Sequence, residues 1–208
     1  MLFKSFPVGP FQCNCIILGC EKTKTAMVID PGGDLDRILE VLSFHKLSLH
    51  NILHTHAHLD HVGATEALKK KMGGTTGLHE DDMELVQNLS VQADLFGLPT
   101  PDTPVIDQFL VDGLTLGCGN DISVEILHTP GHTPGSLSFY IPSVGLMTGD
   151  TLFAKSIGRT DLWGGSHSTL ISSIKKKLLS FPDETTVYPG HGPKTTIETE
   201  RKENPFLT

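Results

Sequence analysis

Histidine and aspartate side chains are crowded into the segment HTHAHLDH, residues 54–61. His56 and His58 are two positions apart, so in extended backbone their side chains point to the same side. Asp60 and His61 follow closely and can face the same space from its other edge. Neutral imidazole and carboxylate groups suit Zn, Mn or Fe, and such a polar group would be costly to bury without an ion. These four side chains are therefore predicted to bind metal.

The segment lies at a predicted junction between a strand and a helix, where loops carry side chains on a rigid scaffold. Residues 51–53, with the sequence NIL, indicate the end of a short buried strand. Residues 62–72 carry apolar side chains at roughly helical spacing, and Gly73 and Gly74 supply a helix stop. His54 belongs to the incoming strand and is interpreted as a packing or supporting residue.

Further ligands are expected downstream, because four side chains rarely complete such a site. His128 and His132 lie in the turn segment LHTPGHTPGS. Asp150 ends an apolar strand in GLMTGDTLF, and His191 ends another in TVYPGHGP. Each lies in a turn that contains glycine, which lets backbone segments approach closely. A residue that caps its own turn is the alternative for each one alone, but their recurrence at strand ends favours one shared site.

The apolar pattern of the whole chain predicts many short strands with flanking helices. Strands are expected near residues 3–7, 13–19, 26–30, 50–54, 75–78, 109–111, 114–116, 122–127, 136–140, 145–148 and 185–188. Helices are expected after an N-cap at Asp34, over residues 80–97 and over about 168–179. We expect one domain over residues 1–208, since no linker divides the chain.

The segments THAHLDH, PGHTPGS, GDTLF and YPGHG, in this order and at these separations, resemble the motifs of the metallo-β-lactamase superfamily. The branch that they resemble most is the glyoxalase II-like branch, whose members hydrolyse thioesters such as S-lactoylglutathione. The resemblance runs from VIDPGG at residues 28–33 to ENPFL near the end of the sequence. It implies an α+β fold, the four-layer αβ/βα sandwich, with the metals in the groove between two sheets.

The resemblance assigns seven side chains to two metal positions. His56, His58 and His132 would hold the first ion, Asp60, His61 and His191 the second, and Asp150 would bridge both beside a water or hydroxide. All seven positions carry the residue type that the family pattern requires. It also implies two divalent ions, with zinc favoured over iron or manganese. Asp30 matches a position that supports the site from below, and a simple turn residue is the alternative.

The implied chemistry is hydrolysis by a metal-activated water. Two divalent cations lower the pKa of a bridging water toward neutrality, and one of them can polarise the substrate carbonyl. A thiolate leaves easily, so no separate catalytic Ser, Cys or Lys is needed. Asp60 and Asp150 are the predicted catalytic residues, and Asp60 could orient the nucleophile as well as bind metal. The expected partner is a small-molecule thioester of the S-2-hydroxyacylglutathione type.

Charge and composition exclude other partners. The formal net charge is −8 and the sequence pI about 5.7, which argues against nucleic acid because phosphate binding needs basic patches. The lysine runs at residues 69–71 and 175–177 are interpreted as solvated helix faces. The sequence has no export signal and no apolar run of ~18 residues, so we expect a cytoplasmic protein without a membrane partner. Nothing in the sequence sets the oligomeric state.

The four cysteines match no ligand position of the family. Cys13, Cys15, Cys20 and Cys118 are interpreted as small buried residues in a reducing compartment. Cys13 and Cys15 share one face of a predicted strand, so a metal site or a redox pair is the alternative for these two.

The C-terminal region departs from the longer glyoxalase II enzymes, which have an additional helical domain with glutathione-binding residues. Here the sequence ends with TTIETERKENPFLT, so it resembles the compact single-domain members, and glutathione recognition stays open. In these members residues 152–165 shape the pocket. Arg159 is a candidate to bind a substrate carboxylate, or else to pair with Asp161. Trp163 is expected to pack under this loop, with the pocket wall as the alternative.

Two other enzyme classes compete with this interpretation. GRTD also resembles persulfide dioxygenases, which would bind one iron through His56, His132 and Asp150 and oxidise glutathione persulfide with O₂. Those enzymes usually have YPAHDY where this chain has YPGHGP, which favours the binuclear hydrolase. Hydrolysis of lactones or other esters is the alternative within the hydrolase class. A binding module without activity would have damaged ligands, and none of the seven is damaged.

Overall fold

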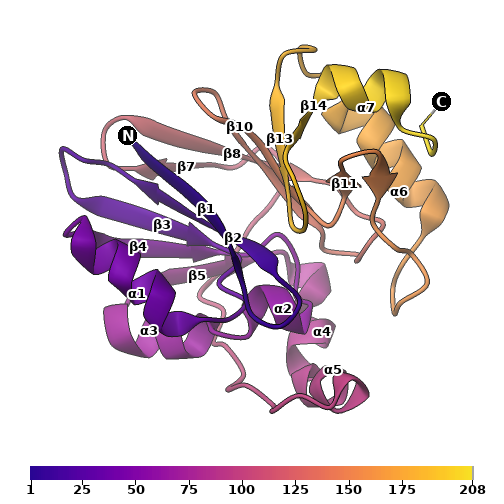
Figure 1. The fold of residues 1–208 in the computed structure, drawn as a ribbon. Coiled ribbons are helices and arrows are strands. Elements are labelled where there is room, and N and C mark those ends of the chain that lie inside the picture. Colours follow the sequence, from indigo (N-terminus) through magenta and orange to yellow (C-terminus); the bar gives the residue numbers. More distant parts are fainter. Residues whose placement is uncertain (208) are drawn as a thin grey trace.

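The computed structural model describes residues 1–207, and these form two six-stranded sheets that face each other (Figure 1). The alternation of side chains along the strands explains this arrangement. In β3 (Thr25–Ile29), Met27 and Ile29 enter the cluster between the sheets, while Ala26 and Val28 enter another cluster beneath helices. Because successive side chains of a strand point to opposite faces, a strand that is buried on both faces needs a layer on each side.

The first sheet has the order β1-β2-β3-β4-β5-β6, antiparallel from β1 to β3 and parallel from β3 to β6. Its other strands are β1 (Leu2–Val8), β2 (Cys13–Gly19), β4 (Ser48–Leu53), β5 (Thr75–Leu78) and β6 (Gln108–Phe109). The second sheet has the order β14-β13-β10-β9-β8-β7, in which only β10 and β13 run parallel. Its strands are β7 (Thr115–Cys118), β8 (Ile122–His128), β9 (Leu137–Ile141), β10 (Gly145–Gly149), β13 (Thr186–Pro189) and β14 (Thr195–Thr196).

Helices cover the outer face of each sheet (Figure 1). The first sheet carries α1 (Leu35–Phe44) and α3 (Thr65–Met72), and the second carries α6 (His167–Ser173), the π-helical turn η2 (Ile174–Leu178) and α7 (Ile197–Glu203). The segments that remain lie near the site: α2 (Leu59–Val62), the 3₁₀ turn η1 (Glu80–Asp82), α4 (Met83–Gln87), α5 (Leu89–Phe96), and the hairpin β11 (Leu152–Phe153) with β12 (Ser156–Ile157). The predicted four-layer αβ/βα sandwich is confirmed.

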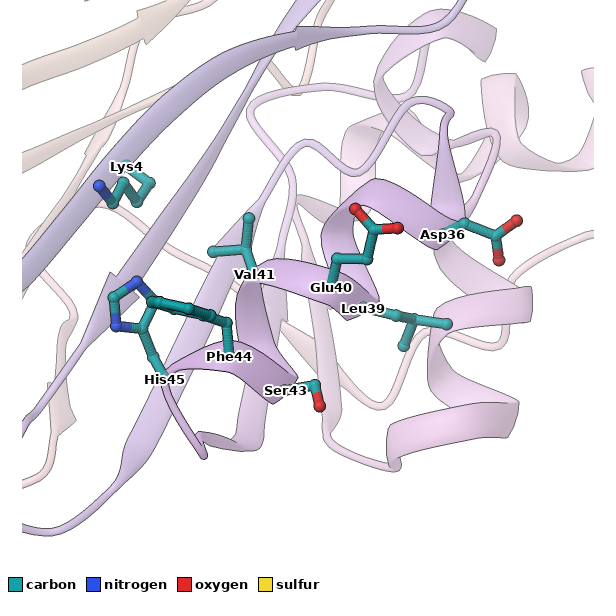
Figure 2. Close-up of a pocket in the computed structure, with 8 residues that line it drawn as sticks. All are labelled: Lys4, Asp36, Leu39, Glu40, Val41, Ser43, Phe44 and His45. Atoms are coloured by element: carbon teal, nitrogen blue, oxygen red, sulfur yellow. The ribbon is translucent and has the colours of Figure 1, made fainter.

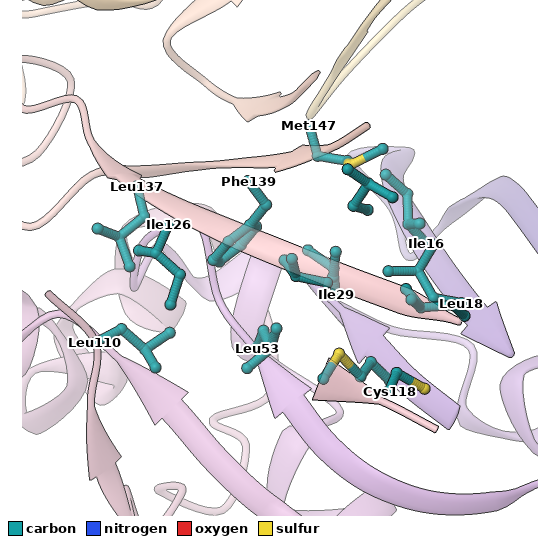
Figure 3. Close-up of a cluster of buried hydrophobic side chains, with 14 of the residues drawn as sticks. Ile16, Leu18, Ile29, Leu53, Leu110, Cys118, Ile126, Leu137, Phe139 and Met147 are labelled. Atoms are coloured by element: carbon teal, nitrogen blue, oxygen red, sulfur yellow. The ribbon is translucent and has the colours of Figure 1, made fainter. Parts of the chain in front are cut away.

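The apolar core between the two sheets holds them together (Figure 3). The first sheet contributes Ile16, Leu18, Ile29 and Leu53, and the second contributes Ile126, Leu137, Phe139 and Met147. All of them are almost fully buried. Fully burying one such side chain contributes roughly 1.5–3 kcal/mol. The core therefore fixes the two sheets against each other and sets the relative positions of the loops at their edges.

Some predicted elements differ in detail from the observed ones. The helix predicted over residues 80–97 is divided into η1, α4 and α5, and the helix predicted to end near 179 finishes in a π-helical turn. Asp34 occupies the N-cap position of α1, but its side chain makes no cap hydrogen bond. Instead Asp34 Oδ2 accepts a hydrogen bond from Gly9 N at 3.0 Å. The predicted cap therefore ties α1 to the turn between β1 and β2.

Within residues 1–207, no helix has both the length and the apolar character that crossing a bilayer requires.

Candidate metal centre

The predicted ligands come from loops at neighbouring edges of the two sheets. His56, His58, Asp60 and His61 follow β4 of the first sheet, within the loop and the short helix α2. From the second sheet come His132 in the turn between β8 and β9, Asp150 directly after β10, and His191 shortly after β13. β10 and β13 are parallel neighbours, so their carboxyl ends deliver Asp150 and His191 to the same edge.

Three imidazoles form the first group of ligand atoms. His58 Nδ1 lies 3.1 Å from His56 Nε2 and 2.9 Å from His132 Nε2. Two nitrogens that each lie 2.0–2.1 Å from a tetrahedral ion would be about 3.3 Å apart. The three nitrogens are close enough to share one ion. The loop after β4 and the turn before β9 thus bring together the residues predicted for the first metal position.

A second group lies beside the first. His61 Nε2 is 3.3 Å from His191 Nε2, and His191 Nε2 is 3.1 Å from Asp60 Oδ2. Asp60 Oδ2 is also 3.7 Å from His61 Nε2. Two imidazoles and a carboxylate therefore converge where the second metal position is predicted.

Asp150 lies between the two groups. Its Oδ2 is 3.7 Å from His132 Nε2, whereas its Oδ1 is 3.4 Å from His61 Nε2 and 3.7 Å from His191 Nε2. Oδ1 is buried and finds no hydrogen-bond partner in the described part of the chain. A buried carboxylate oxygen is costly to leave without a partner, and a cation would satisfy it.

The donor set therefore suits divalent cations, and Asp150 is placed between the two groups of ligand atoms. Gly190 is part of this fit, because a Cβ there would overlap the Asp150 carboxylate. Imidazole and carboxylate ligands suit zinc, iron and manganese.

Two of the ligand imidazoles are held by backbone carbonyl groups through the nitrogen that faces away from the centre. His132 Nδ1 lies 2.8 Å from the Arg159 carbonyl oxygen, and His191 Nδ1 lies 3.0 Å from that of Phe11. In both cases the ring N–H donates to the carbonyl, which leaves Nε2 free to bind an ion. Such partners fix the tautomer and the orientation of a ligand histidine.

Asp30 supports the centre from below, as the family resemblance implied. Its Oδ2 lies 3.0 Å from His61 Nδ1 and accepts a hydrogen bond from Thr55 Oγ1 at 2.7 Å, while its Oδ1 accepts one from Thr55 N at 2.8 Å. Asp30 also has a positive φ of 51°, so the turn interpretation holds as well. One buried carboxylate therefore orients His61 and the start of the ligand loop together.

Asp82 is a supporting residue that sequence analysis missed. Its carboxylate accepts hydrogen bonds from Ala57 N at 3.0 Å, Thr133 Oγ1 at 2.8 Å and Gly135 N at 2.6 Å. Ala57 lies between two ligand histidines, and Thr133 follows His132. Burial raises the pKa of Asp82 to about 6, against the opposing effect of these donors. Within the acidic run HEDDM nothing distinguishes Asp82 from its neighbours, because its partners are far away in the sequence.

Electrostatics favour the cation-binding form at His56, His58, Asp60 and Asp150, whereas at His61 and His191 nearby anionic groups, Asp60 and Asp150 among them, outweigh burial and raise the pKa. Burial lowers the pKa of His58 to about 3 and the pKa of His56 well below its usual value, and neighbouring imidazoles add to both effects. For Asp60 and Asp150, burial acts to raise the pKa, but the imidazoles of His61 and His191 outweigh it and hold the pKa of each carboxyl below its usual range. Neutral imidazoles and ionised carboxylates are the ligating species.

The centre opens into a cavity of about 260 Å³ whose walls include Phe11, Asp60, Arg159 and His191. The Arg159 guanidinium pairs with the Asp161 carboxylate through two contacts of 2.8 Å. This is the internal pair considered as one alternative, while contact with substrate stays a prediction.

A larger hollow of about 1050 Å³ lies against α1 (Figure 2), but none of the residues that line it belongs to a potential metal cluster in residues 1–207.

Trp163 contradicts the packing prediction. Its side chain is 54% exposed and lines a second cavity next to the centre. The physical reason is that Trp163 shares this cavity with side chains of α4 and α5, such as Leu85 and Val91, so it forms part of a cavity wall and is not covered by its own loop.

Two other histidines lie apart from the ligand set. His54 is fully buried, with Nε2 3.3 Å from Thr65 Oγ1, in agreement with a packing role. His128 Nε2 lies 2.9 Å from the Pro134 carbonyl oxygen, and the His128 ring stacks on His79 at 4.0 Å.

All four cysteines are free and buried, as interpreted from the sequence. Cys13 Sγ lies 3.5 Å from His61 Nδ1, and burial raises its pKa to about 12. Since the thiolate is the form that binds metal, Cys13 is a neutral neighbour of the centre.

The comparison with known proteins agrees with this geometry. The family model described as "Metallo-beta-lactamase superfamily" matches residues 8–191. The chain is 42% identical to "Hydroxyacylglutathione hydrolase GloC" of Haemophilus influenzae, over 100% of this chain and 98% of that protein. The solved structure of BLEG-1 B3 metallo-beta-lactamase has a TM-score of 0.91 and 40% identity, with 100% of both chains covered. TTHA1623 in a di-iron-bound form has a TM-score of 0.90 and 38% identity, covering 98% of this chain and 100% of that one.

Fold and site together define the class: a sandwich of two sheets that gathers histidines and aspartates into a metallo-hydrolase centre. The chain belongs to the metallo-β-lactamase superfamily.

Proposed function

We propose that this protein is a binuclear metal-dependent hydrolase that acts on thioesters of the S-2-hydroxyacylglutathione type. His56, His58 and His132 would hold one ion, Asp60, His61 and His191 the other, and Asp150 both. The observation that carries the proposal is the position of Asp150. Its Oδ1, which has no hydrogen-bond partner within the described residues, lies toward His61 of one group, and its Oδ2 lies toward His132 of the other. Zinc is the favoured metal, and the di-iron form of TTHA1623 supports iron as the first alternative.

The bound ions would supply a hydroxide nucleophile at neutral pH and polarise the substrate carbonyl. The residues of the chain would do the positioning. The ionised carboxylates of Asp60 and Asp150 accept hydrogen bonds, so they can align the attacking water. Arg159 lies at the wall of the same cavity, where its guanidinium can exchange the exposed Asp161 for a substrate carboxylate.

The thioester substrate is supported by the likeness to GloC, whose name states hydroxyacylglutathione hydrolase. A thiolate leaving group needs little protonation, which suits a cavity whose acidic side chains, Asp60 and Asp150, are both held ionised. The likeness to BLEG-1, which is described as a B3 metallo-beta-lactamase, keeps cyclic amides and lactones as competing substrates.

The competing mononuclear iron dioxygenase would use His56, His132 and Asp150. Two histidines and a carboxylate are a ligand set typical of such iron enzymes. The binuclear proposal is favoured because Asp60, His61 and His191 also converge, with nitrogens and oxygen 3.1–3.7 Å apart.

The test is a set of parallel assays on one preparation of the metal-loaded protein. S-lactoylglutathione, a simple lactone and a β-lactam are each followed for hydrolysis, and glutathione persulfide is followed with an oxygen electrode. We expect release of glutathione from the thioester at the highest kcat/KM and no oxygen uptake. Oxygen uptake with persulfide and no thioester hydrolysis would reject the proposal in favour of the dioxygenase.

A further inference from the structure

The metal cavity continues into a second cavity of about 210 Å³. The two cavities share four lining residues, His58, Gln92, Phe96 and Leu162. His58 presents Nδ1 to the predicted first metal position, and its ring also forms part of the wall of the second cavity. A substrate whose reacting carbonyl lies at the centre can therefore extend directly into this space.

The second cavity is apolar and partly open. Leu85, Val91, Leu95 and Phe96 line it from α4 and α5, and Leu162 and Trp163 line it from the loop after β12. Several of these side chains are strongly exposed: Val91 at 61%, Leu95 at 71% and Trp163 at 54%. Contiguous exposed apolar side chains commonly mark a binding surface, because their contact with water is unfavourable.

Gln92 holds the apolar wall in place against the metal loop. Its Oε1 accepts a hydrogen bond from Leu59 N at 2.9 Å, and its Nε2 donates to the Leu85 carbonyl oxygen at 3.0 Å. The first bond ties α5 to the residue between His58 and Asp60, and the second ties α5 to α4. The distance between the apolar wall and the ligand loop is therefore fixed by the fold.

Charge decides which part of a thioester fits this cavity. Within residues 1–207, His58 is the only titratable side chain that lines it, and its Nδ1 is turned toward the ligand nitrogens of His56 and His132. A glutathione moiety carries two carboxylates and an ammonium group, which would be costly to move into an apolar site. The acyl substituent is small and uncharged, so it matches the cavity in size and polarity.

We propose that the cavity formed by Val91, Leu95, Phe96, Leu162 and Trp163 binds the acyl substituent, and that the enzyme selects aromatic or branched 2-hydroxyacyl thioesters over the lactoyl thioester. This inference rests on the proposed thioesterase activity. The methyl group of a lactoyl thioester leaves most of the cavity unfilled, whereas a phenyl ring reaches the apolar wall.

The first experiment measures kcat/KM for glutathione thioesters that differ only in the acyl group: lactoyl, 2-hydroxyisocaproyl and mandeloyl. We expect kcat/KM to rise by about tenfold or more from lactoyl to mandeloyl, since apolar pockets discriminate about 10–200-fold for each methylene that they accommodate. Equal values across the series, or a preference for lactoyl, would overturn the inference. Hydrolysis of none of the three would instead defeat the proposed function and this inference with it.

The second experiment needs no turnover. Trp163 is the only tryptophan, so its fluorescence reports on the cavity. Mandelate is expected to shift its emission saturably, while lactate, which has the same carboxylate and hydroxyl groups, is not. No shift with mandelate would count against an apolar acyl site.

Variants separate the cavity from a general surface effect. Leu95→Gln keeps a helix-forming residue on α5 and is expected to lower kcat/KM more for the mandeloyl than for the lactoyl thioester, which reduces the mandeloyl-to-lactoyl ratio by about fivefold to tenfold. The matched control is Phe44→Ala, which removes an 82% exposed apolar side chain at the hollow beside α1 (Figure 2). An unchanged ratio in Leu95→Gln, or an equal fall in Phe44→Ala, would overturn the inference. The inference would also be overturned if the wild type formed a dimer that Leu95→Gln abolished and showed no preference among acyl groups. That result would assign the surface to contact with a second copy of the chain.

Discussion

Ligand imidazoles of both groups divide their two nitrogens between the protein and the centre. His132 and His191 turn one nitrogen to the backbone carbonyl groups of Arg159 and Phe11, and His61 turns one to Asp30. Spacing alone could predict the four ligands within residues 56–61, and the family resemblance supplied His132, Asp150 and His191. The structure brings the atoms of all seven together, although metal binding itself stays a prediction. Asp82 could not be predicted, because its role depends on three donors that are distant in sequence.

His54 gives a prediction about pH and stability. Burial lowers its pKa from 6.5 to about 4, so the folded protein keeps it neutral while the unfolded chain takes up a proton below pH 6.5. The contribution of the buried, neutral ring to stability is fully present above pH 6.5 and is lost as the pH falls toward 4. The loss in the free energy of unfolding amounts to about 3 kcal/mol. Between pH 7 and pH 4, the free energy of unfolding should therefore fall by about 3 kcal/mol less in His54→Gln than in the wild type.

Urea unfolding of chelator-treated protein at both pH values measures this difference. His50→Gln is the matched control, because that histidine is exposed in β4. Identical pH dependence in the wild type and His54→Gln would show that burial of this ring does not affect acid stability.

Arg159 gives a prediction about substrate affinity. In Arg159→Gln the KM for S-lactoylglutathione should rise about tenfold with little change in kcat, since the guanidinium is predicted to contact a remote carboxylate equally in the ground and transition states. Asp161→Asn should lower KM a few-fold, because it frees Arg159 from its 2.8 Å pair. The Arg159 carbonyl that holds His132 is unaffected by either change. If steady-state kinetics give the same KM for both variants and the wild type, Arg159 has no contact with substrate.

At the scale of elements, the short helix α2 depends on a glycine turn from a different part of the chain. Gly32 packs so closely on α2 that a Cβ would overlap the Asp60 carbonyl oxygen, and Pro31 O accepts a hydrogen bond from Ala64 N at 2.9 Å. The strands could be predicted because apolar alternation is a local signal. The division of α4 from α5, the β11–β12 hairpin and the exposed position of Trp163 could not, since long-range contacts set them.

Gly32→Ala is predicted to displace α2 and the ligands that it carries. The free energy of unfolding should fall by roughly 1–3 kcal/mol from overpacking, and the second ion, which would depend on Asp60 and His61, should be lost first. The control is Gly117→Ala, where a Cβ meets no atom within 4 Å and φ is not positive. Urea unfolding with metal analysis measures both effects. Two retained ions in Gly32→Ala would show that α2 does not depend on this contact.

At the scale of the whole molecule, the centre exists because two sheets are packed against each other. The first sheet supplies the ligand loop after β4, while the second supplies His132, Asp150 and His191. His61 and His191, whose ring nitrogens lie 3.3 Å apart, are separated by 130 positions in the sequence. The core between the sheets therefore sets the geometry of the centre, and bound ions would in turn link the two sheets.

The most direct test of this account is elemental analysis of metal per chain in protein purified without added metal, with activity measured on the same samples. The account predicts two transition-metal ions per chain in the wild type. Asp150→Ala should keep its fold but hold fewer ions and lose turnover, because Asp150 is the side chain shared by both groups. A fully active wild-type sample without transition metal, or an Asp150→Ala variant with the metal content and activity of the wild type, would contradict it.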